Sequence, residues 1–114
     1  MLITVLKSKI HRATVIEANL DYHGSCSIDK DLMYSSGIEE HEQIHIYNIN
    51  NGERFITYAI PSDVPGMIAL NGSAARLGMV NDLIIICAYG QVKRTEEFRP
   101  KVVFVDDKNL KVES

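Results

Sequence analysis

The sequence lacks the long apolar runs that mark exported or membrane-spanning proteins. Its apolar N-terminal stretch, MLITVLKSKIHR, is interrupted by Lys7 and Lys9 before it reaches the length of a signal-peptide core. The longest apolar runs, such as residues 83–88, are strand-sized and far below the roughly 20 residues that a membrane helix requires. We therefore expect a cytoplasmic protein that is not embedded in a membrane.

Cysteine is scarce, and there is no excess of positive charge. Because export is not expected, Cys26 and Cys87 are interpreted as reduced, buried small hydrophobic residues, and we predict no disulfide. The formal net charge of −3 at pH 7 gives no general attraction to nucleic acid or to anionic lipid. Phosphate-rich partners are therefore disfavoured.

The length and the residue pattern predict one small β domain. The 114 residues, 46% of them hydrophobic, are enough for a single domain over residues 1–114 with one modest core. Segments rich in Val, Ile, Thr and Tyr alternate with turn signals, and no helical-period stretch exceeds about two turns. The expected strands are residues 2–6, 12–18, 44–49, 54–60, 67–70, 83–89, 102–105 and 110–112. This pattern is typical of a compact β-barrel.

Three local signals refine this prediction. The pair Asn51 and Gly52 lies between two alternating apolar runs and predicts a hairpin, because both residue types accept positive φ angles. Asp29 can cap a helix over KDLMYSS that Gly37 ends. The segment GSAARLG, residues 72–78, predicts a second helical turn, whose amide-rich start either faces an anion or merely links two strands.

The segment YHGSCSID, residues 22–29, has a specific chemical potential. A serine hydroxyl beside a peptide carbonyl can attack it when the loop holds the geometry, and the preceding Gly24 can reach strained conformations. The ester formed by Ser25 can eliminate across Cα and Cβ, and the resulting dehydroalanine can hydrolyse to a pyruvoyl group. Taken alone, a Gly-Ser pair is much better explained as part of an ordinary polar loop.

The segment NNGERFITYAI supplies further candidates. Strand alternation places Arg54, Ile56 and Tyr58 on one face and Thr57 on the other, so a twist or bulge is needed to bring Thr57 and Tyr58 to one site. The guanidinium of Arg54 matches a carboxylate bidentately, and Tyr58 can donate a proton at neutral pH. Alternatively, Arg54 is simply solvated, as most arginines near hairpins are, and Tyr58 simply packs against its neighbours, as a tyrosine in a strand more often does.

Two further groups of polar residues could bind an acidic substrate or a metal ion. The tetrapeptide KIHR, residues 9–12, could act with Arg54 to offset the two carboxylates of an acidic substrate, or form a plain charged strand edge. His41 and His45 have helical spacing, but the segment from Ile44 is a predicted strand, so we expect no metal. There is no cysteine pair, phosphate loop or serine hydrolase elbow.

In their order and spacing these segments resemble the aspartate 1-decarboxylase family, the pyruvoyl enzymes that supply β-alanine for pantothenate synthesis. The resemblance covers nearly the whole chain. It rests on KIHRATVIEANLDYHGSCSIDKDL, INNGERFITYAI, ALNGSAARLGMVNDLIIICAY and, more loosely, RPKVVFVDDKN.

The resemblance implies a six-stranded double-ψ β-barrel with two or three short helices, assembled as a homotetramer with active sites at subunit contacts. It also implies self-cleavage after Gly24, which divides the chain into residues 1–24 and residues 25–114. The larger fragment would begin with a covalent pyruvoyl group made from Ser25. No metal and no pyridoxal phosphate are then required, and a maturation factor is a further partner to consider.

The resemblance also assigns roles to single residues. Ser25 matches the processed serine, Thr57 the threonine that assists processing, and Tyr58 the proton donor. Lys9 and Arg54 match the cations that anchor the substrate. The segment that contacts substrate corresponds to Gly72, Ser73 and Ala74. Further positions that line the pocket correspond to His11, Tyr22, Asn71 and Ile85.

Three departures from the family pattern are visible. Ser73 stands where alanine is usual and adds a hydroxyl to the presumed substrate loop. Asn81 replaces a usual glycine, which a positive φ angle would tolerate. The stretch from Gly90 to Phe98 is shorter than is common.

The implied reaction is α-decarboxylation of L-aspartate to β-alanine and CO2, with Tyr58 protonating the former α-carbon. Two alternatives stay open. One is a noncatalytic barrel that serves as a binding or adaptor module, since this fold hosts unrelated functions. The other is a pyruvoyl decarboxylase of another acidic amino acid, such as glutamate.

Overall fold

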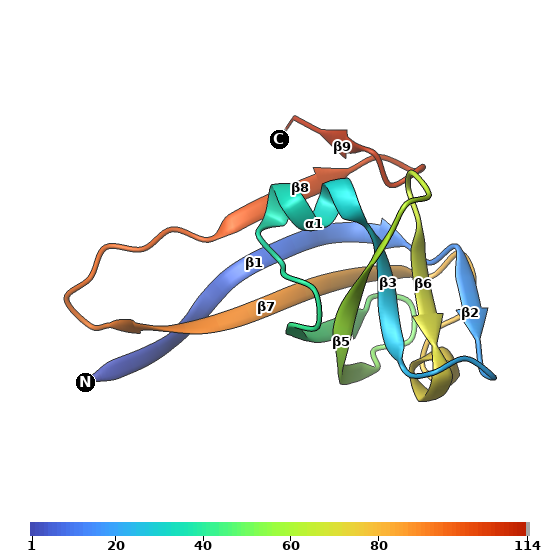
Figure 1. Ribbon diagram of the computed structural model, residues 1–114, viewed down its shortest axis with the longest axis horizontal. Helices are drawn as coiled ribbons and strands as arrows, with labels where there is room; N and C mark the ends of the chain where they lie inside the picture. Colours follow the sequence, from blue (N-terminus) through green and yellow to red (C-terminus); the bar gives the residue numbers. More distant parts are fainter. Residues whose placement is uncertain (114) are drawn as a thin grey trace.

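The computed structural model describes residues 1–113 and is mainly β (Figure 1). Its elements are β1 (Leu2–Thr14), β2 (Glu17–Asn19), β3 (Ser25–Asp29), α1 (Lys30–Ser36), β4 (Gln43–Asn48), β5 (Arg54–Ser62), β6 (Ile68–Asn71), the 3₁₀ helix η1 (Gly72–Arg76), β7 (Leu83–Lys93), β8 (Lys101–Val105) and β9 (Lys111–Val112). The strand order is β2-β6-β3-β5-β4-β7-β1-β8-β9. The predicted β class is confirmed.

The longest strands, β1 and β7, form an antiparallel ribbon that runs the length of the molecule (Figure 1). β8 pairs parallel to the middle of β1, from Ser8 to His11. The register of β1 against β7 shifts twice, between Leu6 and Ser8 and between Ile10 and Ala13. Such bulges increase the local twist of a strand, and here β1 continues through both of them while paired to β7 on one side and β8 on the other.

A single apolar cluster fills the space between the sheet and α1. Ile10 on β1, Ile28 on β3, Ile46 on β4 and Ile86 on β7 are all fully buried within it. Their neighbours along each strand point away from the core, as the two-residue period of a strand requires. The core therefore fixes the register of the strands that carry the candidate site.

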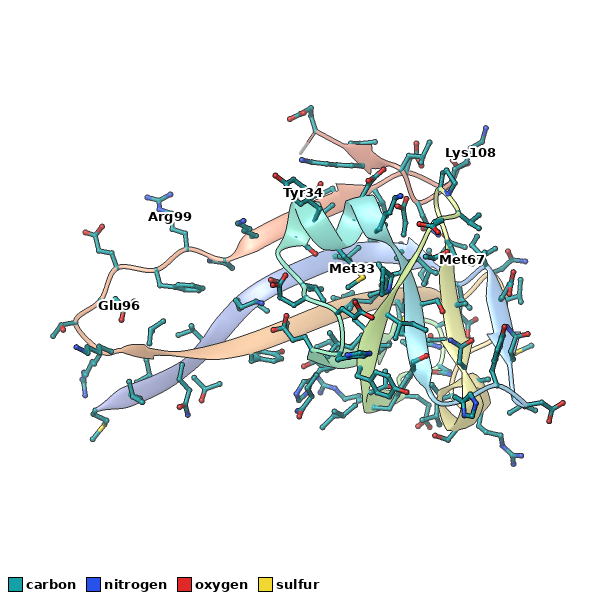
Figure 2. All side chains as sticks on the ribbon, in the orientation of Figure 1. Met33, Tyr34, Met67, Glu96, Arg99 and Lys108 are labelled. Carbon is teal, nitrogen blue, oxygen red and sulfur yellow. The ribbon has the colours of Figure 1, made fainter. Side chains whose placement is uncertain are left out.

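The helix α1 begins and ends where its capping residues predict. The Asp29 carboxylate accepts hydrogen bonds from the backbone N–H of Asp31, at 2.9 Å, and of Gly66, at 2.8 Å. Gly37 has φ 76° and closes the last turn. On α1, Met33 is buried against the core and Tyr34 is exposed to solvent (Figure 2).

The predicted hairpin is present between β4 and β5, which are antiparallel. Its loop is longer than a two-residue turn, because β4 ends at Asn48 and β5 begins at Arg54. Gly52 takes the positive φ of 77°, and the side-chain Oδ1 of Asn48 accepts the N–H of Asn50 at 2.9 Å. The side chain of Asn48 thus organises a loop that the Asn-Gly pair alone did not define.

The number and limits of the elements differ from the prediction. The described residues form nine strands rather than six, with one α-helix and one 3₁₀ helix in place of two or three helices. Residues 2–6 and 12–18 were expected as separate strands, but β1 runs without a break to Thr14 because its bulges absorb the irregular pattern. β3 was expected as loop, because its alternate polar residues hide the fact that both of its edges are paired, to β5 and β6.

Candidate functional site

The Gly24–Ser25 peptide lies at the entrance to β3. Ser25 is 2% exposed and is the register partner of Asn71 on β6. Its φ angle is 149°, a positive value that residues with a side chain rarely adopt. Backbone strain of this kind is typically retained only where the surrounding structure enforces it, and it clusters at reactive sites.

The hydroxyl of Ser25 is held by one amide. The Nδ2 group of Asn71 donates to Ser25 Oγ at 3.0 Å and to Ser27 Oγ at 3.0 Å. Asn71 is itself 4% exposed, so its bond to the buried Ser25 is shielded from water, whereas its bond to Ser27 is only partly buried. This arrangement fixes Ser25 Oγ next to its own backbone and leaves the hydroxyl proton free to be transferred.

Gly72 brings the start of η1 against the same peptide. Its φ is +66°, and a Cβ atom added there would lie 2.9 Å from both the Cα and the N of Gly24 and 3.0 Å from the carbonyl oxygen of Tyr22. Only glycine fits this backbone contact. The exposed Gly24 is therefore contacted on one side by a chain segment that is far from it in the sequence.

A cavity of about 240 Å³ opens beside Ser25. That volume holds several water molecules at about 30 Å³ each, and so is large enough for a small polar ligand. Its lining residues are Tyr22, His23, Gly24, Ser25, Ser27, Tyr58, Ile60 and Asn71. The structure thus brings together five predicted site residues from three separate parts of the chain: Tyr22, Gly24, Ser25, Tyr58 and Asn71.

Tyr58 and Thr57 diverge, as strand alternation predicts. Tyr58 lines the cavity, is 38% exposed, and has the ring of His41 at a centroid distance of 6.3 Å. Thr57 is half-buried on the opposite face of β5 and pairs with Ile44. Thr57 is not among the residues that line the Ser25 cavity in the described part of the chain.

The two predicted anchoring cations lie away from this cavity. Arg54 is four residues before Tyr58 on β5, which places it about 13 Å away along the strand. Lys9 lies on β1, separated from β5 by β7 and β4, so three inter-strand spacings amount to about 14 Å. Within one chain, the Ser25 cavity, Lys9 and Arg54 therefore lie at separate places on the sheet.

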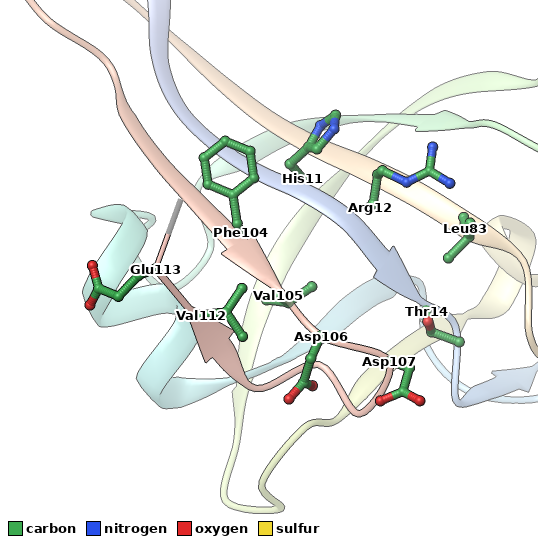
Figure 3. A pocket seen from close by; sticks show the side chains of 10 residues that line it. All are labelled: His11, Arg12, Thr14, Leu83, Phe104, Val105, Asp106, Asp107, Val112 and Glu113. Carbon is green, nitrogen blue, oxygen red and sulfur yellow. The ribbon is translucent and has the colours of Figure 1, made fainter.

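His11 lies at a third place. It lines a cleft of about 500 Å³ between β1, β8 and β9, where its ring meets Phe104 edge-on at a centroid distance of 5.6 Å (Figure 3). Burial, with the charges of Lys9 and Arg12, lowers the pKa of His11, which favours the neutral imidazole. Ile85 pairs with Tyr47, close to Arg54. Neither His11 nor Ile85 is among the residues that line the Ser25 cavity in the described part of the chain.

The three residues that the sequence predicted to contact substrate differ in their exposure to solvent. Gly72 and Ala74 are buried, and Ser73 is exposed at the start of η1. The added hydroxyl of Ser73 therefore points to solvent within this chain.

Comparison with known proteins decides the family. The model of the aspartate decarboxylase family matches residues 1–112. This chain belongs to that family. It is 57% identical over 112 residues to an aspartate 1-decarboxylase of Albidiferax ferrireducens, covering 96% of this chain and 83% of the relative. It is 54% identical over 111 residues to that of Campylobacter jejuni, covering 96% and 88%, and 53% identical over 109 residues to that of Methylococcus capsulatus, covering 93% and 86%.

Three residues of this aspartate decarboxylase family member line the Ser25 cavity without having been assigned to it from the sequence: His23, Ser27 and Ile60. Ser27 was within reach of sequence reasoning, because residues i and i+2 of a strand share a face. It was missed because β3 was expected as loop. Ile60 follows Tyr58 by the same rule, whereas His23 precedes β3 outside any strand, where strand alternation gives no signal.

Two further findings bear on ligands and location. Within residues 1–113, no group of three or more His, Cys, Asp or Glu side chains is arranged to hold a metal ion. No helix in that part of the chain is long and apolar enough to cross a membrane.

Proposed function

We propose that this chain is an aspartate 1-decarboxylase that converts L-aspartate to β-alanine and CO2 with a pyruvoyl group made from Ser25. The observation that carries the proposal is the strained, buried Ser25, whose hydroxyl is held by Asn71 beside the Gly24 peptide. The names of the relatives supply the substrate. We further place the enzyme in the cytoplasm and in pantothenate synthesis.

The residues around Ser25 fit the formation of a pyruvoyl group from that serine. Ser25 Oγ forms a bond to the carbonyl carbon of Gly24 while the Gly24–Ser25 C–N bond breaks and the nitrogen gains the hydroxyl proton. The ester then loses the Ser25 Cα proton, and the Gly24 carboxylate departs. Water adds to the resulting enamine and ammonia leaves, which gives residues 1–24 and residues 25–114. Because a positive φ at Ser25 costs energy in the uncut chain, cleavage also relieves strain.

In the mature site, the pyruvoyl group provides one part of the chemistry and the side chains provide the rest. A pyruvoyl group supplies an electron sink that accepts the electron pair left by a departing carboxylate. Tyr58 lines the same cavity, and its Oη is the proton donor to the former α-carbon. Thr57 would act during processing, by way of the backbone it shares with Tyr58.

Substrate anchoring falls to Lys9 and Arg54, assisted by the loop residues Gly72, Ser73 and Ala74. The amine and the carboxylates of one aspartate are only a few bonds apart. Arg54 lies about 13 Å along β5 from Tyr58, so Arg54 and Tyr58 of the same chain cannot hold one aspartate together. We therefore propose that Lys9 and Arg54 of one subunit, with Ile85 beside Arg54, face the Ser25 cavity of a neighbouring subunit in a homotetramer, and that His11 joins the pocket from its separate cleft.

We also propose a more specific fold than the mainly β class. We propose that residues 1–114 form one six-stranded double-ψ β-barrel domain, to which the shorter strands are additions. The support is the mixture of pairings, since β1 with β8 and β3 with β5 are parallel in a mainly antiparallel sheet. A maturation factor that speeds the cleavage remains part of the proposal.

The test is a paired assay of purified protein with L-aspartate and with L-glutamate. We expect release of CO2 and formation of β-alanine from aspartate, little or no release from glutamate, and no activity in Ser25→Ala, which stays uncut. Preferred turnover of glutamate would change the substrate but keep the chemistry. A fully active Ser25→Ala variant would rule the proposal out.

A further inference from the structure

Arg54 is held in place by an aromatic ring. Tyr47 on β4 is the cross-strand partner of Arg54 on β5, so both side chains stand on the same face of the sheet. The guanidinium Cζ of Arg54 lies 4.5 Å from the centroid of the Tyr47 ring, which is cation–π distance. No ion pair joins Arg54 to a carboxylate within residues 1–113. Its charge is therefore available to a ligand.

Tyr47 is itself held by Tyr89 on β7. The two hydroxyl oxygens lie 2.6 Å apart, a short hydrogen bond. This bond and burial raise the pKa of Tyr89, so its phenol stays protonated at neutral pH. The ring of His45 meets the Tyr89 ring edge-on at a centroid distance of 4.9 Å and supports it from β4. A line of contacts therefore runs from Tyr89 through Tyr47 to Arg54.

The same face carries the second cation. Lys9 is the register partner of Cys87 on β7, and Cys87 is in turn the register partner of His45 on β4. Tyr89 and Tyr47 each lie two residues from this line, on the β7 and β4 strands that separate Lys9 from Arg54. A cleft of about 330 Å³, lined by His45, Tyr47, Arg54, Phe55 and Ile56, opens beside this arrangement.

The benefit of such an arrangement is a gain in ligand affinity. A free arginine side chain has much rotamer entropy to lose when it binds an anion. A guanidinium already stacked on a fixed ring has lost part of that freedom before the ligand arrives, so binding is stronger. Tyr47 can fix the guanidinium only while its own ring is fixed, and the Tyr89 hydroxyl provides that restraint.

We propose that Tyr89 is a positioning residue for recognition of the substrate carboxylate: through Tyr47 it holds the guanidinium of Arg54 where a carboxylate of the acidic substrate binds. The inference rests on the proposed function, which supplies the acidic substrate. Tyr89 acts through Tyr47 and Arg54, and not by contact with the reacting atoms.

The experiment measures how tightly the processed wild-type protein and its variants bind succinate, by calorimetry. Succinate is a dicarboxylate without the amine that the reaction needs, so its Kd reports anchoring alone. Tyr89→Phe removes one hydroxyl and keeps the ring against His45. We expect the Kd for succinate to rise about two- to tenfold, the net effect of one hydrogen bond. The KM for aspartate should rise similarly, with kcat and self-cleavage nearly unchanged.

Two controls make the result specific. Tyr34→Phe removes a hydroxyl from an exposed tyrosine on α1 and should leave all values unchanged. In an Arg54→Lys background, Tyr89→Phe should have almost no further effect, because its action passes through the guanidinium.

An unchanged Kd in Tyr89→Phe, an equal loss in both Arg54 backgrounds, or no binding of succinate to the wild type would overturn the inference. Absence of aspartate turnover would instead count against the proposed function, and the succinate affinities would still decide the role of Tyr89.

Discussion

Replacing Gly72 with alanine should damage both the fold and the self-cleavage, because the position touches the scissile peptide. The new Cβ would lie 2.9 Å from the Cα and the N of Gly24, a distance that real Cβ contacts do not show. The backbone of one of the two segments must therefore move. Any such shift displaces the carbonyl that Ser25 Oγ has to reach.

The expected cost has two parts. Holding an alanine at the φ of +66° costs about 1–2 kcal/mol. Overpacking against the backbone of Gly24 adds about 1–3 kcal/mol. Gly52 provides a matched control, since its φ is +77° but its added Cβ would have nothing within 4 Å. Gly52→Ala should therefore show only the first part.

The assay compares the two variants in a Ser25→Ala background, so that every chain is uncut, at equal protein concentration. Gly72→Ala should melt roughly 10 °C below Gly52→Ala, because about 2 kcal/mol of extra cost is worth 4–8 °C per kcal/mol in a domain of this size. With Ser25 restored, Gly72→Ala should also cut itself more slowly than Gly52→Ala. Equal stability together with equal cleavage rates in the two variants would refute the reasoning.

Three further predictions follow from single contacts. Tyr58→Phe should still cut itself but lose about 10²–10⁴-fold in kcat, and near-normal turnover would remove Tyr58 as proton donor. Asn109 is buried and bonds the backbone of Thr14 and Gly66, so Asn109→Ala should lose about 3 kcal/mol of unfolding free energy in urea; a loss below about 1 kcal/mol would contradict this. Burial raises the pKa of Cys26 to about 12 from 9.0, so its thiol should resist alkylation at pH 9 until the protein unfolds. Because the folded state holds that proton more tightly, this contribution to stability is complete below pH 9 and declines as the pH rises from 9 towards about 12, a trend that Cys26→Ala should weaken.

The sequence predicted best those features that depend on neighbouring residues. Asp29 and Gly37 define α1 because capping is a local interaction, and the structure follows them to the residue. Asn81 has the positive φ, 78°, expected of an asparagine in place of a glycine. Gly52 marks its hairpin for the same local reason.

Features that depend on distant partners were not predictable from one sequence. The polar residues of β3 are compatible with a strand only because β5 and β6 pair with it on both sides, which nothing within SCSID reveals. The bond from Asn71 to Ser25 joins residues 46 positions apart. The separation of Arg54 from Ser25 likewise depends on the sheet order and the path of β5, and family resemblance named both residues without placing them.

Denaturing mass spectrometry of the purified, active protein tests most directly the claim that the chain makes its own cofactor. The account predicts two species, residues 1–24 and residues 25–114, with the larger one lighter by one ammonia than a fragment that begins with serine. Active protein consisting only of the intact 114-residue chain would contradict it.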